Sequence, residues 1–388
     1  MTLPTLLVTG DFVKTGGMDR ANHALALHIA RTGAPLHLVA FRVADDLLAF
    51  PNVHFHKLEK TAGSYFLSER LLDREGCAVA KQLAAQGGRT LVNGSNCTWP
   101  EFNWVHHVHH ADIPPLAGGV LRRAKVAIQR AKYRRDEKRI VPRAKYVITT
   151  CERTKNDIVH HLGVPAERIK VIFMGVDGHL FKPADRTQRE ATRREMGLPL
   201  DRPIAAFVGA LGDRRKGFDT LFSAWEQLCK DPAWDVDLAV VGRGMELPNW
   251  QKRAADAGLA ERVRFLGFVK DLPAFLSSCD LHVLPSRYEG YSLATQEALA
   301  CGIPAFITVT AGIADRYPEN VRDLLVQDPN DVAGLVAQMR AWRRNPEDAA
   351  RRLAPFSEKI RGHSWDDMAR EIVAHMDAMG CQGKAPVA

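Results

Sequence analysis

The chain of 388 residues is long enough for two ordinary domains, and its composition (46% hydrophobic, 25% charged) is typical of a soluble globular protein. A formal net charge of +8 favours anionic partners, and the absence of any uninterrupted apolar run of about 18 residues predicts no membrane-spanning segment. The opening residues, MTLPTLLVTGDF, lack a basic leader segment, so we expect no secretory signal and a cytoplasmic location.

The cysteines are scattered, odd in number and without a C-x-x-C pair. This pattern supports neither a disulfide framework nor a zinc framework. We interpret the cysteines as small buried thiols in a reducing cytosol. The positions are Cys77, Cys97, Cys151, Cys229, Cys279, Cys301 and Cys381.

The first pattern along the chain is a strand, a glycine-containing loop and a helix. Residues 5–9 (TLLVT) predict the strand, and the loop after it carries Gly16 and Gly17. Asp19 is the predicted N-cap of a helix that continues to about Arg31. Such a unit is typical of nucleotide-binding α/β folds, although GDFVKTGG lacks the G-x-G-x-x-G dinucleotide fingerprint.

Four histidines within five residues follow the strand expected over residues 90–93. In an extended segment alternate residues face opposite sides, so His107 and His109 are expected on one face, with His106 and His110 on others. A metal site is one interpretation, but it lacks a clear third ligand type. We favour the alternative that one or two of these histidines meet a substrate while the rest pack or face solvent.

Residues 121–145 form a basic segment with eleven Lys or Arg residues against two acids. Val126, Ile128, Ala131 and Ile140 are expected to keep it helical and partly docked. A helix of this kind can lie on anionic lipid or meet a charged acceptor, and a solvated helix face is the alternative. Nucleic-acid binding is not expected, because no recognised binding module or aromatic platform accompanies the charge.

Two more strands are predicted over residues 146–150 and 169–173, separated by a helix over residues 154–162. The chain then turns away at Met174. The charged stretch of residues 185–195 is interpreted as the crossing between two halves.

The second half opens with an apolar strand over residues 204–208 and a loop that runs from Gly209 to Gly217. Arg215 and Lys216 stand at the end of this loop, just before the next helix. Adjacent cations close to a helix N-terminus form a phosphate-binding arrangement, and the flanking glycines allow the backbone to approach a ligand.

An Asp-x-Asp sequence at Asp235 and Asp237 opens the strand expected over residues 238–241. A metal–nucleotide site is possible, but this position predicts that both carboxylates lie at the N-terminal end of the strand, away from the ligand edge. Arg243, between two glycines at the other end of the strand, is better placed to line a ligand.

The strongest pattern is a buried strand, a short loop and a helix within LHVLPSRYEGYSLATQEALACGIPAF. The strand is expected over residues 281–286, and the helix begins near Leu293. Glu289 lies in the loop and Glu297 a little over one turn inside the helix, so both are close to a helix N-terminus, which attracts anions. Carboxylates beside an anion site suit a ligand that is part phosphate and part polyol, such as a sugar nucleotide.

Strands and helices alternate in both halves, which predicts an α/β protein with two doubly wound parallel sheets. Further helices are expected over residues 332–342 and from Trp365 to about Met379. Ligands of such sheets bind at the carboxyl ends of strands, so the site is expected in a cleft between two facing sheets.

With these elements in view, EGYSLATQEALACGIP resembles the E-x7-E element of the retaining family 4 glycosyltransferases of GT-B fold. GALGDRRKGFDTL resembles the phosphate loop of that family, MGVDGHLFKP its domain crossing, VKDLPAFLSSCDLHVLPS its base-binding region and HSWDDMA its last helix. GGMDR and VHHVHHA are similar to its glycine loop and its histidine strand end. The resemblance covers nearly the whole chain.

The resemblance implies a GT-B fold with two Rossmann-like domains facing across a cleft. Residues 1–180 would form the acceptor domain, residues 181–360 the sugar-nucleotide domain, and residues 361–388 a C-terminal helix that crosses back. The implied reaction is hexosyl transfer from a UDP- or GDP-linked donor to a glycan, lipid-linked or small-molecule acceptor. It would retain the anomeric configuration through front-face attack, without a cofactor or a metal.

The resemblance also implies roles for individual residues. Arg215 and Lys216 would hold the donor diphosphate and stabilise the leaving group. Glu289 would bind hydroxyls of the transferred sugar, and Glu297 would bind the ribose. His109 best matches the family histidine, with His107 or His110 as alternatives. The remaining donor-binding positions would be Gly16, Gly17, Gly209, Arg243, Val269, Gly290, Tyr291, Ser292 and Leu293.

Two departures from the family pattern leave the donor sugar open. Tyr291 and Ser292 stand where the family often has Phe-Gly, and residues 308–320 (TVTAGIADRYPEN) replace its usual glycine-rich loop. Alternatives to transfer are a sugar-nucleotide epimerase or hydrolase of the same fold, and a non-catalytic protein that binds a sugar nucleotide or a membrane surface. The Arg215–Lys216 loop together with E-x7-E argues against both.

Overall fold

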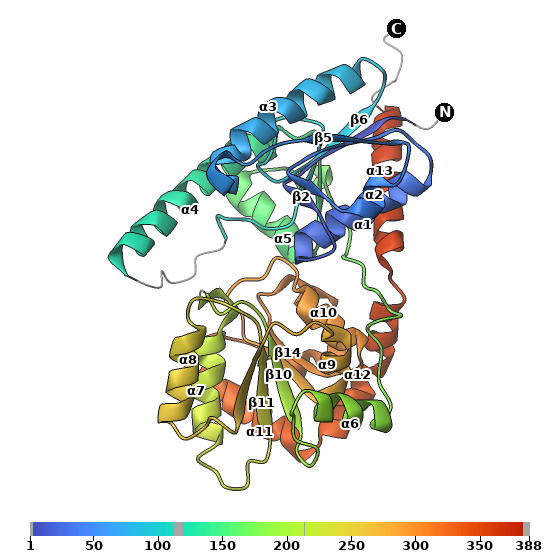
Figure 1. Ribbon diagram of the computed structural model, residues 1–388. Coiled ribbons are helices and arrows are strands. Elements are labelled where there is room, and N and C mark those ends of the chain that lie inside the picture. Colours follow the sequence, from blue (N-terminus) through green and yellow to red (C-terminus); the bar gives the residue numbers. More distant parts are fainter. Residues whose placement is uncertain (1–2, 112–118, 213, 383–388) are drawn as a thin grey trace. The chain divides into compact units, whose positions relative to one another are not determined.

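The computed structural model of the chain describes residues 3–111, 119–212 and 214–382, with side chains up to residue 380 (Figure 1). The chain folds into two compact units. Unit 1 combines Met1–Ala111, Ile128–Gly175 and Ser364–Ala388, and unit 2 combines Asp112–Ala127 and Val176–His363.

The main sheet of unit 1 is entirely parallel in the described residues. Its strands are β1 Thr5–Val8, β3 Leu36–Ala40, β5 Val53–Lys57, β6 Arg89–Asn93, β7 Phe102–Val105, β8 Tyr146–Thr149 and β9 Ile169–Val171; β2 Asp11–Phe12 and β4 Arg42–Val43 form a separate pair. The order is β5-β3-β1-β6-β7-β8-β9, so the direction of winding reverses between β1 and β6. Leu6 of β1 pairs in parallel with His37 on one side and Thr90 on the other.

Helices pack against this sheet. Leu6, Val8, Leu72, Val79 and Leu83 belong to one core cluster between β1 and α3. The helices are α1 Gly17–Arg31, α2 Asp45–Leu48, α3 Tyr65–Ala84, α4 Val120–Ile140, α5 Glu152–Asp157 and α13 Trp365–Gln382, with short 3-10 helices η1 Thr61–Gly63, η2 Val141–Arg143 and η4 Ala166–Arg168 and a π-helix η3 Ile158–Leu162. Residues 120–127 of α4 belong to unit 2.

One prediction about these helices is wrong. The N-cap of α1 is Gly16, with φ of 83°, and Asp19 lies in the first turn instead of capping it. The basic segment is helical and partly docked as predicted: Ile140 of α4 is buried, whereas Ile128 is 67% exposed.

The sheet of unit 2 has the doubly wound order predicted for a nucleotide-binding domain. Its strands are β10 Ile204–Val208, β11 Asp237–Val241, β12 Val263–Gly267, β13 Leu281–Leu284, β14 Ala305–Thr308 and β15 Leu325–Val326. All described pairs are parallel, in the order β12-β11-β10-β13-β14-β15. The prediction of two parallel α/β sheets is therefore confirmed.

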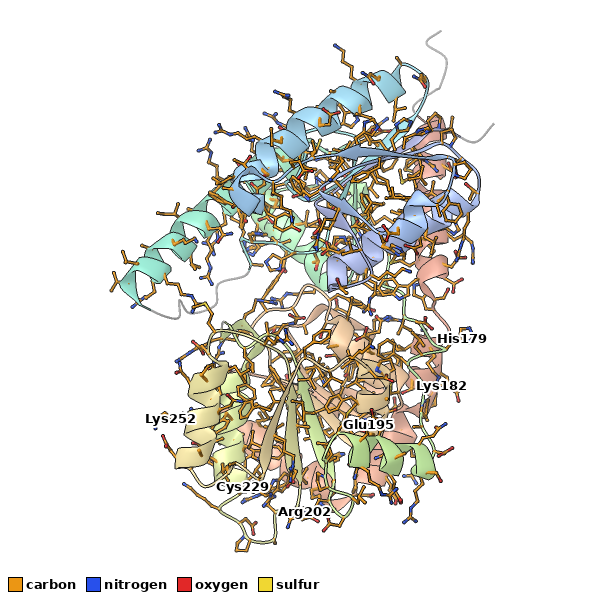
Figure 2. All side chains as sticks on the ribbon, in the orientation of Figure 1. His179, Lys182, Glu195, Arg202, Cys229 and Lys252 are labelled. Atoms are coloured by element: carbon orange, nitrogen blue, oxygen red, sulfur yellow. The ribbon has the colours of Figure 1, made fainter. Side chains whose placement is uncertain are left out.

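Helices and short turns complete unit 2. His179, Lys182, Glu195, Arg202 and Lys252 are exposed polar side chains of this unit (Figure 2). The elements are α6 Arg186–Glu195, α7 Phe218–Leu228, α8 Leu247–Asp256, α9 Leu272–Ser278, α10 Leu293–Ala300, α11 Val332–Arg344 and α12 Pro346–Arg361, with turns η5 Arg214–Lys216, η6 Gly312–Arg316 and η7 Glu319–Leu324.

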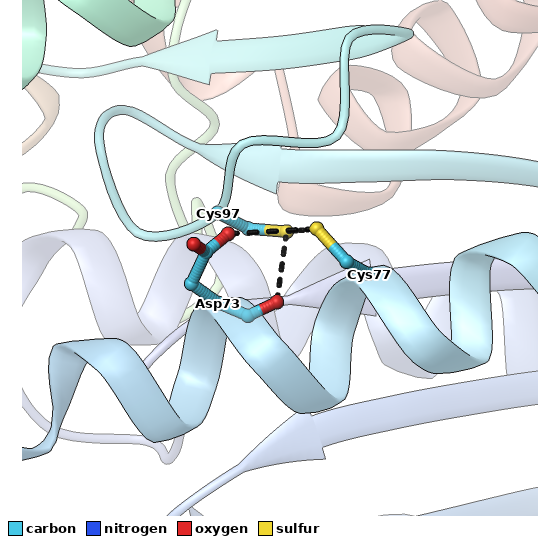
Figure 3. A group of neighbouring side chains, drawn as sticks. All are labelled: Asp73, Cys77 and Cys97. Carbon is cyan, nitrogen blue, oxygen red and sulfur yellow. Dashed lines mark hydrogen bonds between the residues drawn. The ribbon is translucent and has the colours of Figure 1, made fainter.

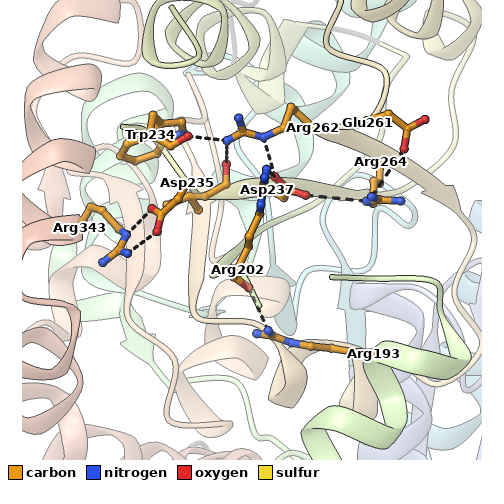
Figure 4. Close-up of polar contacts among 10 residues, drawn as sticks. Arg193, Arg202, Trp234, Asp235, Asp237, Glu261, Arg262, Arg264 and Arg343 are labelled. Atoms are coloured by element: carbon orange, nitrogen blue, oxygen red, sulfur yellow. Dashed lines mark hydrogen bonds and ion pairs between the residues drawn. The ribbon is translucent and has the colours of Figure 1, made fainter. Parts of the chain in front are cut away.

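The Asp-x-Asp sequence is part of an ionic network at the N-terminal end of β11 (Figure 4). Asp235 binds Arg343 through two hydrogen bonds of 2.7 and 2.5 Å, and Asp237 accepts one of 2.7 Å from Arg262. The prediction that these carboxylates lie away from the carboxyl edge of the sheet is confirmed.

The interpretation of residues 185–195 as the crossing between the halves is wrong, because the chain already enters unit 2 at Val176. The charged stretch instead forms α6 inside unit 2, capped by Asp185. Arg193 of α6 is buried, and its guanidinium lies 2.7 Å from the carboxylate of Asp280. It also donates to the carbonyl oxygens of Ser278 (2.9 Å) and Arg202 (3.0 Å), the latter drawn in Figure 4. One side chain thus connects α6 to the starts of β10 and β13.

We predict that Arg193→Met destabilises the protein by about 2–3 kcal/mol, because it leaves buried carbonyl groups and the Asp280 carboxylate with fewer donors. Urea unfolding of the full chain measures this loss. Arg186→Ala is the matched control on the same helix: Arg186 is 93% exposed in its pair with Glu190, and its removal should change the free energy of unfolding by less than about 0.5 kcal/mol. Equal effects of the two substitutions would contradict the assignment.

Candidate active site

The winding of the unit 2 sheet reverses between β10 and β13, and the loops that follow these strands form the candidate site. Ligands of doubly wound sheets bind at such a switch point, at the carboxyl ends of the strands. The loop after β10 carries Arg215 and Lys216, and the loop after β13 carries Glu289. The structure therefore brings together, within unit 2, the loops that sequence analysis singled out separately.

Gly217 allows these two loops to approach each other. Its φ is 71°, and a Cβ atom there would lie 1.8 Å from the carbonyl oxygen of Pro285. Only glycine fits this position. On the other side of the contact, the N–H of Arg287 donates to the carbonyl of Arg215 at 2.8 Å. The backbone thus fixes the two cations beside the start of α7.

Glu289 lies between both cations. Its Oε1 accepts hydrogen bonds from Nη1 of Arg215 at 2.6 Å and from Nζ of Lys216 at 2.5 Å, and the residue is 6% exposed. Burial by itself would raise the pKa of Glu289, but the charges and hydrogen bonds of Lys216 and Arg215 outweigh it and hold that pKa below its ordinary value. Glu289 is therefore a carboxylate at neutral pH.

The start of α10, three residues after Glu289, has an unusual backbone. Ser292 precedes the helix with φ of 85°, a left-handed conformation in a residue other than glycine. Its hydroxyl lies 2.8 Å from that of Thr295, and its carbonyl accepts from the N–H of Gln296 at 3.1 Å. Strain of this kind concentrates at functional sites and is held in place by surrounding contacts. Gly290, Tyr291 and Leu293 belong to the same turn.

The two departures from the family pattern contact each other. Arg316, in the segment that replaces the glycine-rich loop, donates to the hydroxyl of Tyr291 at 2.6 Å. The N–H of Ile313, in the same segment, donates to the carbonyl of Tyr291 at 2.9 Å. The substitution at Tyr291 and the altered loop therefore form one structural feature beside Glu289.

The other predicted donor-binding residues of unit 2 lie on the same carboxyl edge of the sheet. Gly209 follows β10, and its carbonyl oxygen would be 1.8 Å from a Cβ atom on Gly242. Arg243, next to Gly242 after β11, is exposed, and its guanidinium lies 5.4 Å from the ring centroid of Phe268. Val269 comes just after β12, and Glu297 of α10 is buried (4% exposed).

In unit 1 the histidine segment follows β7 and is held by a residue that sequence analysis missed. The buried carboxylate of Glu137, on α4, accepts from the backbone N–H of His109 at 2.9 Å and of His110 at 3.2 Å. It also lies 2.8 Å from Nδ1 of His110. The His107 and His109 rings are 4.7 Å apart, in agreement with their predicted shared face.

A polar cluster after β1 and β3 in unit 1 was also missed. Asp11 is buried, and one of its carboxylate oxygens accepts a 2.6 Å hydrogen bond from Arg42 and a short one from Tyr65. Its other oxygen, Oδ1, is buried and has no hydrogen-bond partner among the residues that the structure describes. The ammonium of Lys60 lies 3.6 Å from the centroid of the Tyr65 ring. Asp19 of α1, two residues after Gly17, interacts electrostatically with Asp11, so the cluster lies near the start of α1.

Two family models match most of the chain. The model described as Glycosyltransferase Family 4 matches residues 15–179, and the model described as Glycosyl transferases group 1 matches residues 202–345.

Similar sequences carry one recurring name. The D-inositol 3-phosphate glycosyltransferase of Salinispora tropica is 32% identical over an alignment of length 405, gaps included. The alignment covers 94% of this chain and 81% of that protein. The D-inositol 3-phosphate glycosyltransferase of Geodermatophilus obscurus is 30% identical over 249 residues, which cover 61% of this chain and 53% of that protein. The match to the second relative thus spans about half of its length.

Solved structures show the same fold. The sucrose-phosphate synthase of Thermosynechococcus elongatus has a TM-score of 0.76 at 20% identity, covering 98% of this chain and 100% of that chain. HepE of Anabaena, in complex with UDP and glucose, has a TM-score of 0.68 at 18% identity, covering 97% and 99%. These likenesses confirm the GT-B fold expected from the sequence.

The polar cluster of unit 1 predicts a pH dependence. Burial and the charge of Asp11 raise the pKa of Asp19 from 3.8 to about 6. Between these values the folded chain keeps a proton that the unfolded chain has lost, so this contribution to stability falls as pH rises from about 4 to 6. Asp19→Asn removes this ionisation. The free energy of unfolding of the variant minus that of wild type should therefore increase as the pH rises from about 4 to 6. Urea unfolding at pH 4, 5, 6 and 7 measures it, and a constant or decreasing difference would contradict the account.

Proposed function

Because the chain belongs to glycosyltransferase family 4, we propose that it transfers a sugar from a nucleoside-diphosphate sugar to a hydroxyl group and retains the anomeric configuration. The observation that carries this proposal is the contact of Glu289 with Arg215 and Lys216 at the switch point of the unit 2 sheet. It supplies two cations for a diphosphate and a fixed carboxylate for sugar hydroxyls.

The diphosphate would bind where Arg215 and Lys216 meet the N-terminus of α7. Two cations share one carboxylate there, so the group keeps one net positive charge. The helix N-terminus adds free N–H groups and the positive end of its dipole. When the bond from the sugar to the diphosphate breaks, this charge stabilises the leaving group, and no metal is needed for that role.

Glu289 would act as a hydrogen-bond acceptor and not as an acid. Its lowered pKa leaves it without a proton to donate at neutral pH. Both side-chain partners of Glu289 are cations, whereas double displacement on a glycoside uses two carboxyl groups about 5 Å apart. We therefore favour front-face attack: the acceptor hydroxyl forms the new bond on the face that the diphosphate leaves, and a diphosphate oxygen takes its proton. Glu297 would hold the ribose.

The polar cluster of unit 1 is the proposed place of the acceptor. Asp11 Oδ1 is available to accept a hydrogen bond from a hydroxyl, and Arg42 and Lys60 supply positive charge for an anionic group. His109 would contact the substrate, with Glu137 positioning its backbone. The name shared by the relatives makes D-inositol 3-phosphate, a phosphorylated polyol, the first acceptor to test. Glycans and lipid-linked sugars are the other candidates.

The bases of the candidate donors are uracil and guanine. HepE of Anabaena was solved with UDP and glucose, which supports UDP-hexoses as the first donors to test. The Tyr291–Arg316 contact lies beside Glu289, so we propose that it selects the sugar.

We also propose that α4 brings the protein to an anionic membrane from the cytoplasmic side. Val120 and Leu121 are 81% and 88% exposed, and Ile128 is 67% exposed. Arg123 and Lys125, on the same stretch of the helix, are exposed as well. Exposed apolar side chains among cations suit the surface of an anionic bilayer. Among the described residues, no helix combines the length and apolar character needed to cross one.

We predict that Glu289→Gln, or Arg215→Ala combined with Lys216→Ala, lowers kcat/KM at least 100-fold, because each removes charge that acts on the bound donor. Release of the nucleoside diphosphate from a donor panel, with and without acceptor, measures the activity. Arg214→Ala is the matched control, since Arg214 is an exposed neighbour in η5 without an assigned role, and it should retain activity. Added Mg²⁺ or Mn²⁺ should leave the wild-type rate unchanged.

Three outcomes would contradict this proposal. Near-normal turnover of either variant would reject the site, and an inverted product anomer in the NMR spectrum would reject retention. Donor hydrolysis that no acceptor in the panel diverts into a glycoside would favour a hydrolase.

The membrane proposal predicts that wild-type protein co-sediments with vesicles that contain phosphatidylglycerol at low salt, and less with neutral vesicles. Leu121→Ser combined with Ile128→Ser should reduce the bound fraction several-fold, because these side chains enter the interface. Leu48→Ser, a change at an apolar residue of α2 that is 44% exposed, is the control and should bind like wild type. Equal binding of all three proteins, or none by wild type, would reject the proposal.

A further inference from the structure

Helix α3 and the loop after β6 bring two cysteines and an aspartate together in unit 1 (Figure 3). Asp73 and Cys77 lie four residues apart on α3, and this spacing puts both side chains on one face of the helix. Cys97, which is fully buried, comes from the loop between β6 and β7. Their side chains are of types that bind metal ions. Among the described residues, these three form the group of His, Cys, Asp or Glu side chains whose ligand atoms all lie within 4.8 Å of one another.

The distances within this group suit a tetrahedral metal ion. The two Sγ atoms are 3.7 Å apart, and Sγ of Cys77 is 3.5 Å from Oδ1 of Asp73. Zinc bonds of about 2.3 Å to sulfur and about 2.0 Å to oxygen give, at tetrahedral angles, S···S and S···O separations of about 3.8 and 3.5 Å. Two of the three separations therefore match those around a bound zinc ion, and the third, between the Cys97 thiol and the Asp73 carboxylate, is within 4.8 Å.

The surroundings of Asp73 and Cys97 favour these positions of their side chains. The backbone N–H and the hydroxyl of Thr98 donate to Oδ1 of Asp73 at 2.7 and 2.8 Å. Hydrogen bonds of this kind fix the ligands of metal sites from outside. At Gly76, a Cβ atom would lie 3.0 Å from Sγ of Cys97, so a larger residue there would push the Cys97 side chain away.

We propose that Asp73, Cys77 and Cys97 bind one zinc ion. Each thiol loses its proton to solvent when the metal binds, so two thiolates and one carboxylate coordinate the ion. Water would take the fourth position, because Cys77 and Asp73 are only partly buried. The ion joins α3 to the loop that precedes β7. This site has no part in the proposed transfer reaction, and its test is independent of activity.

A disulfide between Cys77 and Cys97 is the competing outcome for the same geometry. In the structure both cysteines are free thiols, and their Sγ atoms are 3.7 Å apart, well beyond the about 2.05 Å of a disulfide bond. A metal ion fits between sulfur atoms at this separation and displaces the proton of each thiol on coordination. The carboxylate of Asp73, with its two donors from Thr98, has a role in a metal site and none in a disulfide.

Titration with Co²⁺ tests the proposal on the reduced, chelator-treated full chain. We expect one equivalent per chain to bind, with the thiolate-to-cobalt charge-transfer absorption of a two-sulfur site, and zinc to displace it. Cys77→Ser should lower the affinity more than 100-fold and halve the charge-transfer intensity. Thr98→Val, which removes one outer hydrogen bond, should lower the affinity about 10-fold. Cys229→Ser, at a partly buried cysteine in unit 2, is the control and should bind like wild type.

A second readout separates binding at this site from binding elsewhere. Zinc should raise the melting temperature of wild type and of Cys229→Ser, and leave Cys77→Ser unchanged, because a ligand stabilises only the state that binds it. No charge-transfer absorption in wild type, or an unchanged one in Cys77→Ser, would overturn the proposal. So would a Cys77–Cys97 disulfide that forms in air while the reduced protein takes up no cobalt.

Discussion

A buried carboxylate held between two cations determines the candidate site. Glu289 is 6% exposed and would be costly to bury alone, but Arg215 and Lys216 offset that cost. The contact is possible because Gly217 lets the loop after β10 approach the loop after β13. The close approach of the two loops at Gly217 and the two ionic contacts of Glu289 therefore occur at the same place, where the strand order of the sheet reverses.

The same arrangement connects folding to the proposed chemistry. Because the cations share one carboxylate, they are held in place before any donor binds and keep a net positive charge toward a diphosphate. Little reorganisation is then needed when charge develops on the leaving group. The strained Ser292 and the Arg316–Tyr291 contact surround this group, so changes in donor preference within the family are expected to concentrate there.

The sequence predicted most of the fold and singled out the loops that the structure brings together in unit 2, because both depend on short-range patterns. Buried parallel strands read as apolar runs, and glycines mark the loops at their ends. The missing parts depend on contacts between distant segments. Glu137 is one of two acids in a basic helix, and nothing local shows that it caps the histidine segment. The prediction of Asp19 as the N-cap was wrong because the helix already begins at Gly17, with Gly16 in a positive-φ conformation as its N-cap. The Asp73–Cys77–Cys97 group was missed because Cys97 is distant in sequence from the other two residues.

The proposed function depends most on Arg215 and Lys216 binding the diphosphate of the donor. Isothermal titration of UDP, GDP, UMP and GMP into wild type and into the Arg215→Ala, Lys216→Ala double variant tests this role without an acceptor. We predict that one nucleoside diphosphate binds wild type at least 10-fold more tightly than its monophosphate, and that the double variant loses this difference. Equal binding of the diphosphate by both proteins would contradict it.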